Sequence, residues 1–218
     1  MSTSCRSADS PFERESDRQE HAQFWAALER ERREWMARPS IVADLRSNHA
    51  GETGAVYIYA GAQQAMAWRR RLYNETRLGQ RAAAFAAEHK ATEQRHLRYF
   101  DRLLPERQRS ALLPLWRSAG FALGFVPSLV GPNALFVTVE SVEQFVEQHY
   151  TDQIEPLERA GQFPALAALL RECCSEEVHH KEEARALRPS SRTALMADLW
   201  GQVIATGSAA AVAVCRRI

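Results

Sequence analysis

Two segments of this 218-residue chain place glutamate and histidine on the apolar side of a helical repeat. Residues three and four apart share one face of an α-helix, so a stripe can be followed along each segment. In 80–104 the stripe consists of Ala82, Ala86, His89, Glu93, His96, Phe100 and Leu103. In 163–187 it consists of Leu166, Leu170, Cys173, Glu177, His180, Ala184 and Leu187. Each stripe therefore puts one Glu-x-x-His pair among residues that a folded protein buries.

A second Glu-x-x-His pair, Glu176 and His179, overlaps the pair in 163–187 with a shift of one residue. Its stripe consists of Ala165, Leu169, Glu172, Glu176, His179 and Glu183. That composition is typical of a solvated helix face. Helical phase thus favours Glu177 and His180 as the buried pair, and predicts that Glu176 and His179 lie on the outer face.

Two other helical segments each offer one glutamate on their apolar face. In 132–159 this residue is Glu143, which follows Phe136 and Val139 at helical spacing. Glu140 and Glu147 lie about 60° and 40° from Glu143, toward the polar flank, at about 100° per residue.

The corresponding residue of 44–74 is Glu52, the only carboxylate well inside that segment, which precedes Val56 and Tyr59 on one face. The order of a lone Glu followed by Glu-x-x-His thus occurs twice along the chain. This repeat predicts two helical hairpins that build one pseudo-twofold site.

The predicted fold class is all-α: a ferritin-like four-helix bundle of two pseudo-symmetric helical hairpins with extra apolar helices. One Glu from each of two helices and Glu-x-x-His from each of the other two is the pattern of di-iron and di-manganese carboxylate bundles. Four carboxylates neutralise two divalent ions, and each imidazole completes the coordination of one. Without metal, burying these four carboxylates in an apolar core would cost several kcal/mol each, or the carboxylates would take up protons. The candidate metal ligands are Glu52, Glu93, His96, Glu143, Glu177 and His180.

Any one of these residues could instead belong to a satisfied core ion pair. All six in the right order and phase favour the metal pair, while the choice of iron or manganese stays open.

Residues 1–40 are predicted to be an N-terminal extension, and 41–218 a ferritin-like domain that holds the metal pair; the resemblance described below implies that this is a di-iron hydroxylase domain. The extension begins with a polar tail over 1–16 and continues as one amphipathic helix over 17–37, which Pro39 and Ser40 are expected to end. The last helix of the chain is expected over 192–216.

The segment 111–139 is strongly apolar, but Pro114, Arg117, Pro127 and Pro132 interrupt it. A spanning helix needs about 20 uninterrupted apolar residues, so this segment is expected to lie on a bilayer as a hairpin or to be buried. Polar residues likewise weaken a span over Leu199–Cys215. We therefore expect neither segment to cross a membrane.

The charges nearly balance, because 28 Lys and Arg stand against 27 Asp and Glu, and no global field draws this chain to nucleic acid. The arginine runs 30–33 and 69–71 are interpreted as solvated faces. Four cysteines form no CxxC pair, and free thiols in a reducing compartment are expected. The N-terminal residues lack the apolar core of a signal peptide and are too acidic for a transit peptide, which predicts a location on the cytoplasmic side.

Several short motifs are similar to one known family. They are Asn48-His-Ala-Gly-Glu-Thr-Gly-Ala55 with Ile58-Tyr-Ala-Gly61, Glu93-Gln-Arg-His96-Leu97, Pro114-Leu-Trp116, Gly120-Phe-Ala-Leu-Gly124, Val139 to Tyr150, and Glu176-Glu-Val-His-His180. In this order they resemble the demethoxyubiquinone hydroxylase family (3-demethoxyubiquinol 3-hydroxylase), over about residues 41–218. The family's metal ligands fall on the six candidates. His149 and Tyr150 match its His-Tyr pair and are expected to support the ligands from behind.

The resemblance implies a membrane-associated di-iron monooxygenase that acts in the penultimate step of ubiquinone biosynthesis. Its cofactor would be two Fe ions, with O2 as co-substrate, and it would hydroxylate the ring carbon of demethoxyubiquinone or demethoxyubiquinol that lacks a methoxy group. The implied partners are a polyprenylated quinone, a membrane surface and other ubiquinone-biosynthesis proteins, with no nucleic acid. The implied location is the cell membrane, peripheral, on the cytoplasmic side.

Two alternatives are weighed against this hypothesis. One is a ferritin-like iron storage or peroxide-reducing protein, which would need a polar iron-exit path or an added cysteine metal site. The other is a non-catalytic helical scaffold, in which the buried charges form ion pairs only.

Overall fold

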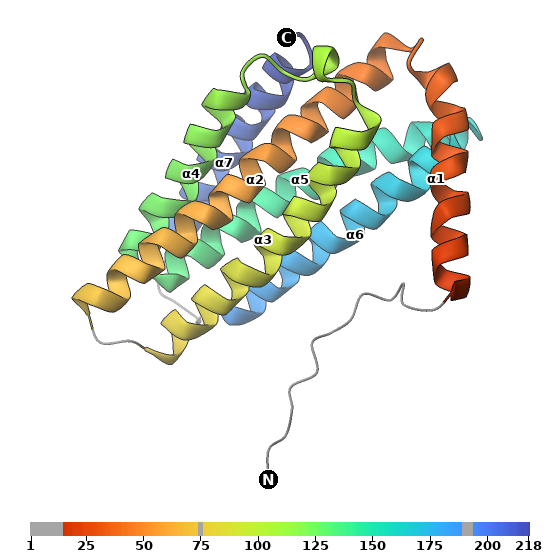
Figure 1. Ribbon diagram of the computed structural model, residues 1–218. Helices are drawn as coiled ribbons and strands as arrows, with labels where there is room; N and C mark the ends of the chain where they lie inside the picture. The colour runs from red at the N-terminus through yellow and green to blue at the C-terminus, as the bar shows by residue number, and fades with distance from the viewer. Residues whose placement is uncertain (1–14, 74–75, 189–193) are drawn as a thin grey trace.

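The computed structural model describes residues 15–73, 76–188 and 194–218, which are helical nearly throughout (Figure 1). The helices are α1 (Glu15–Trp35), α2 (Pro39–Leu72), α3 (Arg77–Leu103), the 3-10 turn η1 (Glu106–Gln108), α4 (Leu113–Val130), α5 (Pro132–Arg159), α6 (Pro164–Leu187) and α7 (Ala194–Cys215). The polar tail expected over 1–16 lies almost entirely outside the described residues, and so does Cys5. Cys173, Cys174 and Cys215 are free thiols, as expected.

Four helices form the bundle, and they pair as two antiparallel hairpins (Figure 1). Helix α2 packs on α3, and α5 packs on α6. Helices α4 and α7 are the extra apolar helices: α4 packs along the outer side of α2, and α7 along α5 and α2. Helix α1 lies across one end of the bundle. The prediction of an all-α ferritin-like bundle is thus confirmed.

Three helices begin at a proline, and one of these starts differs from the prediction. Pro39, expected to end the first element, is instead the first residue of α2. Pro132 and Pro164 begin α5 and α6 in the same way. Proline is suited to the first helical position, because its N–H would have no partner there and its φ angle is already helical. A proline after a helical segment can therefore begin the next helix rather than only end the last.

Helix α4 is continuous, although prolines were expected to interrupt this segment. Pro114 lies in its first turn, where a missing N–H costs no intrahelical hydrogen bond, and Pro127 lies in its last turn, where a single such bond, to the carbonyl four residues earlier, is lost. Two glycines bring its backbone against α2: a Cβ atom on Gly124 would lie 1.8 Å from the carbonyl oxygen of Ile58, and one on Gly120 would lie 2.3 Å from that of Gly54. Only glycine fits at such contacts, so α4 is seated directly on α2.

Two described helices are long and apolar enough to cross a membrane by length and composition alone. They are Leu113–Val130 and Asp198–Cys215, and 22% and 11% of these windows are buried. Both run alongside bundle helices in this fold, as Figure 1 shows. That neither crosses a membrane stays a prediction.

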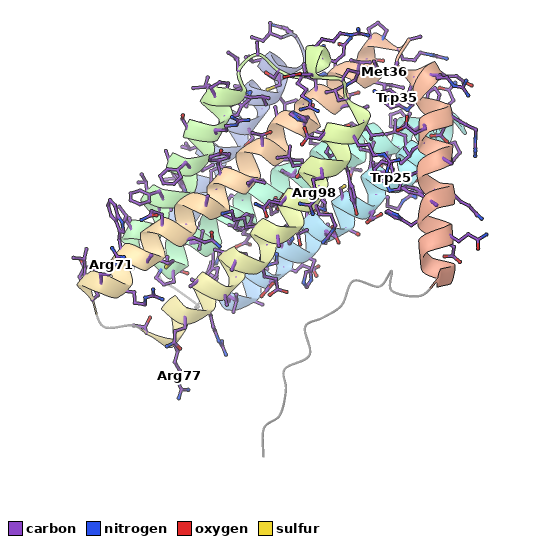
Figure 2. All side chains as sticks on the ribbon, in the orientation of Figure 1. Trp25, Trp35, Met36, Arg71, Arg77 and Arg98 are labelled. Carbon is purple, nitrogen blue, oxygen red and sulfur yellow. The ribbon has the colours of Figure 1, made fainter. Side chains whose placement is uncertain are left out.

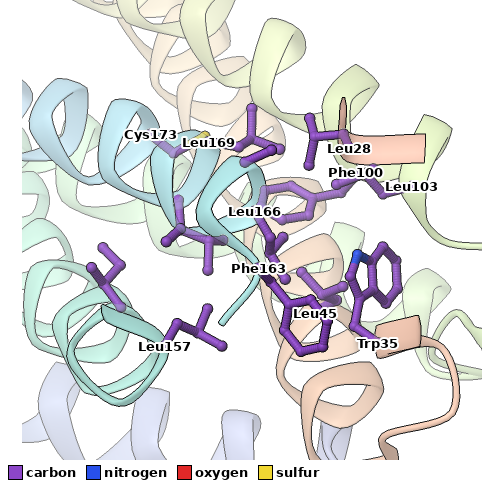
Figure 3. Close-up of a cluster of buried hydrophobic side chains, with 14 of the residues drawn as sticks. Leu28, Trp35, Leu45, Phe100, Leu103, Leu157, Phe163, Leu166, Leu169 and Cys173 are labelled. Atoms are coloured by element: carbon purple, nitrogen blue, oxygen red, sulfur yellow. The ribbon is translucent and has the colours of Figure 1, made fainter. Parts of the chain in front are cut away.

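The largest hydrophobic cluster lies at the end of the bundle that α1 covers (Figure 3). Helix α1 contributes Trp25, Leu28 and Trp35, which are buried, while its opposite side is exposed (Figure 2). Phe100 of α3 and Leu166 of α6 pack into the same cluster. Helix α1 is therefore amphipathic, and its apolar side packs against α3 and α6, the two helices that carry the Glu-x-x-His pairs.

The first turn of α6 is capped by a side chain of α1. Phe163, at the N-cap position, has left-handed backbone angles (φ 49°, ψ 57°) and its side chain makes no capping hydrogen bond. The two carboxylate oxygens of Glu31 accept the N–H groups of Ala165 and Leu166, at 2.8 and 2.9 Å. An anion is favourable at this position, because it satisfies free N–H donors and interacts with the helix dipole.

We expect Glu31→Ala to lower the free energy of unfolding by about 1–2 kcal/mol, the usual effect of losing a cap. Urea unfolding of both proteins measures the difference. Glu34→Ala, also on α1 and exposed, is the matched control and should stay close to the wild type. An equal loss in both variants would mean that Glu31 acts only through the stability of α1 itself.

Candidate metal centre

The six predicted ligands meet in the middle of the bundle, with two helices of each hairpin contributing. Each is at most 4% exposed. Their ligand atoms form two groups, each within 4.8 Å: Glu52, Glu93, His96 and Glu177 in one, and Glu93, Glu143, Glu177 and His180 in the other. Glu93 and Glu177 belong to both groups, which is the arrangement that bridges a pair of metals.

Both histidines face the carboxylates with Nδ1. Nδ1 of His96 lies 2.9 Å from Glu177 Oε1 and 3.5 Å from Glu52 Oε2. Nδ1 of His180 lies 3.1 Å from Glu93 Oε1 and 3.1 Å from Glu177 Oε2. Each imidazole thus presents the same nitrogen to a cluster of carboxylate oxygens, and its other nitrogen points outward.

Several of these inward atoms are buried and, although they lie close to one another, none of them makes a hydrogen bond of acceptable geometry. They are both carboxylate oxygens of Glu93, Glu177 Oε1 and His96 Nδ1. Buried polar atoms in proteins are nearly always satisfied, so unsatisfied donors and acceptors that converge on one point call for an occupant. Carboxylate oxygen and imidazole nitrogen are ligands for iron and manganese. The donor set therefore fits a pair of divalent metal ions.

The electrostatics of the cluster support the same conclusion. Burial, and next the negative charge of Glu177, raise the pKa of both Glu93 and Glu143 well above the ordinary value. Four carboxylates so close together in a low-dielectric core cannot all ionise without cations. Two divalent ions would supply four positive charges and remove the need for protons.

Two tyrosines extend the pseudo-twofold arrangement. The hydroxyl of Tyr150, on α5, donates to Glu52 Oε1 of α2 at 2.5 Å. The hydroxyl of Tyr59, on α2, donates to Glu143 Oε1 of α5 at 3.3 Å. Each tyrosine lies two turns beyond the lone glutamate of its own helix and binds the glutamate of the other. Tyr150 was expected in this role, whereas Tyr59 was not, although its spacing from Glu52 is the same.

The structure separates the two overlapping pairs on α6. His179 is exposed, as expected, whereas Glu176 is half-buried and differs from the expectation of a solvated residue. Glu176 Oε2 lies 2.5 Å from His96 Nε2, and Arg95 donates to Glu176 Oε1, also at 2.5 Å. At about 100° per residue, Glu176 lies beside Glu177 and not opposite it, so its side chain reaches the outer edge of His96.

The outer glutamates of α5 stay away from the cluster. Glu140 pairs with Arg185 at 2.9 Å and with Arg188 at 2.8 Å, and Glu147 pairs with Lys181. Both therefore tie α5 to α6 along the surface, and Glu143 alone points inward.

His89 was named on the apolar stripe of its helix but not as a candidate for the site. It is 2% exposed, its ring centroid lies 4.0 Å from that of His180, and its Nε2 lies 2.7 Å from Glu183 Oε2. Burial lowers its pKa to about 3. His89 is therefore neutral at physiological pH and packs behind His180, in contrast to the carboxylate behind His96.

His149, the other residue expected to support the ligands, lies further from the centre. Its Nε2 is 3.0 Å from the hydroxyl of Ser47, and burial lowers its pKa to about 4. Beside it, Asn48 and Gln153 exchange two hydrogen bonds of 2.8 and 2.9 Å. These polar groups join α2 to α5 next to the metal ligands.

A cavity of about 420 Å³ leads to the carboxylates. It lies among α2, α4, α5 and α7 and reaches Glu52, Glu93, Glu143 and Glu177. Most of its wall is apolar and includes Ile58, Leu123, Val142, Trp200 and Ile204, whereas Ser47, Asn48 and His149 add polar groups. An apolar cavity with a few polar groups at its inner end is typical of a site for a mostly apolar small molecule.

Comparison with known proteins identifies similar chains. The family model described as "Ubiquinone biosynthesis protein COQ7" matches residues 39–215. The NADPH-dependent 3-demethoxyubiquinone 3-hydroxylase, mitochondrial, of Dictyostelium discoideum is 33% identical over 59% of this chain and 55% of its own length. The 3-demethoxyubiquinol 3-hydroxylase of Rhodospirillum rubrum is 37% identical over 66% of this chain and 64% of its own length. The NADPH-dependent 3-demethoxyubiquinone 3-hydroxylase, mitochondrial, of Rattus norvegicus is 31% identical over 83% of this chain and 79% of its own length. The chain thus spans 55% to 79% of the length of these relatives.

Proposed function

The chain belongs to the COQ7 family of ubiquinone biosynthesis proteins, and from this premise we propose that it hydroxylates the ring of demethoxyubiquinone or demethoxyubiquinol. The proposed enzyme is an O2-dependent monooxygenase with two Fe ions. One observation carries the proposal: the buried Glu and His cluster lies at the inner end of an apolar cavity.

The buried cluster would supply the ligands for the two ions. Glu52 and His96 would hold one ion and Glu143 and His180 the other, while Glu93 and Glu177 would contribute to both. When bound, the metal pair supplies the activation of dioxygen. Tyr59 and Tyr150 hold the lone glutamates in place by their hydrogen bonds.

The cavity fits the two parts of a prenylated quinone. Its inner end brings a ring next to the carboxylates, and Ser47 and His149 add hydrogen-bonding groups elsewhere on its wall. Its apolar walls exclude water and suit the first units of a prenyl chain. Because α4 and α7 both line it, the remaining chain can leave between these helices toward lipid.

The exposed apolar residues of α4 and α7 form a surface that we call the α4–α7 face. It comprises Leu115, Phe121, Val126, Leu129 and Val130 of α4 with Leu199, Val203 and Val214 of α7, which are 37% to 76% exposed. A group of exposed apolar side chains of this size is typical of an interaction site. We propose that this face rests on the cell membrane from the cytoplasmic side, as a peripheral contact, and that other ubiquinone-biosynthesis proteins work beside it.

The two alternatives explain less of the structure. Iron storage does not need an apolar cavity that ends at the carboxylates. A scaffold with purely structural ion pairs would satisfy its buried polar atoms internally, whereas neither carboxylate oxygen of Glu93 makes a hydrogen bond of acceptable geometry, although His180 Nδ1 lies 3.1 Å from one of them.

Deleting the gene should cause the methoxy-lacking quinone precursor to accumulate and ubiquinone to fall, and the intact gene should reverse both changes. Quinone profiling of the strain by mass spectrometry measures them. Glu143→Ala should fail to restore ubiquinone, because it removes a proposed ligand. Glu182→Ala, an exposed glutamate of α6, is the control and should restore it. Normal ubiquinone in the deletion strain, in a cell without a second hydroxylase, would end the proposal.

A further inference from the structure

The α4–α7 face carries few charges of its own. Arg117 is the only charged residue in Leu113–Val130, and Asp198 the only one in Asp198–Cys215. Exposed arginines, in contrast, lie at both ends of the face. The α4–α7 face is thus apolar along its length and carries positive charge at its two ends.

At one end, α2 extends the apolar surface. Trp68 is 45% exposed and packs edge-on against Phe125 of α4, with ring centroids 5.1 Å apart, and Leu72 is 72% exposed. Arg69 donates to the carbonyl oxygen of Leu129 at 2.6 Å and so joins this end of α2 to the end of α4. Arg71, next to Leu72, is exposed at the same end of the bundle (Figure 2). Among the described residues it makes no ion pair.

The other end is formed by the C-terminus and the start of α4 (Figure 1). Arg217 follows the last turn of α7 and lies three residues after the exposed Val214. It is exposed and, within the described part of the chain, forms no ion pair. Its neighbour Arg216, in contrast, pairs with Asp44. Arg117, near the start of α4, is also exposed and has no acidic partner among the residues that the structure describes.

Arginine side chains at the margins of an apolar surface can extend their charge to the level of lipid headgroups while their stems remain on apolar surface. Anionic headgroups attract basic side chains within a Debye length. The net charge of the whole chain is only +1, so such an attraction must come from this local arrangement.

We propose that the α4–α7 face binds selectively to bilayers that contain anionic lipid, and that Arg71, Arg117 and Arg217 provide this selectivity. The inference rests on the proposed function, because that function places the face on a membrane. The apolar residues enter the interface, and arginines at both ends hold α4 and α7 parallel to it. The mouth of the cavity between these helices then opens toward the lipid that holds the quinone.

Sedimentation with vesicles tests the selectivity, using the full-length iron-loaded protein. The vesicles consist of phosphatidylcholine alone, or of phosphatidylcholine with phosphatidylglycerol. The wild type should bind the anionic vesicles at least tenfold more tightly, and added salt should weaken this binding. The triple variant Arg71→Gln, Arg117→Gln, Arg217→Gln should lose most of that preference, since each basic residue near an anionic surface contributes severalfold to affinity.

The matched control is Arg30→Gln, Arg33→Gln, Arg38→Gln, which removes three exposed arginines of α1 and of the turn that follows it, outside the α4–α7 face, and it should keep the preference. Equal binding to both vesicles would overturn the inference, and so would an equal loss in the control. Binding to neither vesicle would also overturn it, and a dimer in the same sample would assign the face to a second copy of the chain. Hydroxylation of a detergent-solubilised demethoxyquinol needs no bilayer, so it tests the proposed function separately.

Discussion

Replacing Glu177 with alanine should abolish binding of both metal ions. Glu177 belongs to both groups of ligand atoms, and its two oxygens lie 2.9 Å from His96 Nδ1 and 3.1 Å from His180 Nδ1. Its loss therefore removes a ligand from each metal at once. Elemental analysis after anaerobic loading with Fe(II) should give about two irons per chain for the wild type, as expected for such a ligand set, and close to zero for the variant.

The same substitution should not unfold the protein without metal. Removing Glu177 takes one negative charge away from Glu93 and Glu143, whose pKa values it raises. The substitution also removes the interactions of Glu177 with His180 and His96, which hold its own pKa low, so the two effects oppose each other and the metal-free variant should stay folded. Added metal should raise the thermal midpoint of the wild type only, because only a protein that binds the ion gains stability from it.

Glu182→Ala is the control for this experiment, since Glu182 is an exposed glutamate of the same helix. It should bind metal as the wild type does. Two tightly bound irons in Glu177→Ala would show that the cluster is not the metal site.

The order of the helices and the six inward residues could be predicted because both depend on local periodicity. A buried helix face repeats every three or four residues, so Glu93 and His96 are marked by their apolar neighbours alone. Helix ends were harder to place, since proline both ends and begins helices. Pro39 begins α2, where its missing N–H has no partner to lose, whereas Pro127 lies within the last turn of α4 at the cost of one intrahelical hydrogen bond.

Contacts between helices could not be predicted, because they depend on packing and not on period. Tyr59 and Glu143 are 84 residues apart, and Glu31 caps a helix 134 residues away. The pseudo-twofold repeat offered one usable signal, since Tyr59 follows Glu52 as Tyr150 follows Glu143. No such signal marked Glu176, whose stripe is largely polar but whose carboxylate touches His96.

Glu176→Ala should weaken metal binding about 10- to 100-fold, the usual effect of losing the group that orients a histidine ligand. Glu176 Oε2 accepts from His96 Nε2, and Arg95 holds the other oxygen, so the ring is fixed with Nδ1 toward the metals. Glu176→Gln should lose less, because its amide oxygen can still accept the N–H. Metal titration measures the affinities.

His179→Ala is the sharpest comparison, because His179 adjoins the ligand His180 yet is exposed. It should bind metal as the wild type does. Mössbauer spectra of the iron-loaded proteins should show that Glu176→Ala changes one of the two iron signals, since His96 belongs to one group only and His180 has His89 behind it instead. If His179→Ala lost the metal and Glu177→Ala kept it, α6 would be rotated by one residue, about 100°, and the overlapping pair Glu176 and His179 would be the ligands.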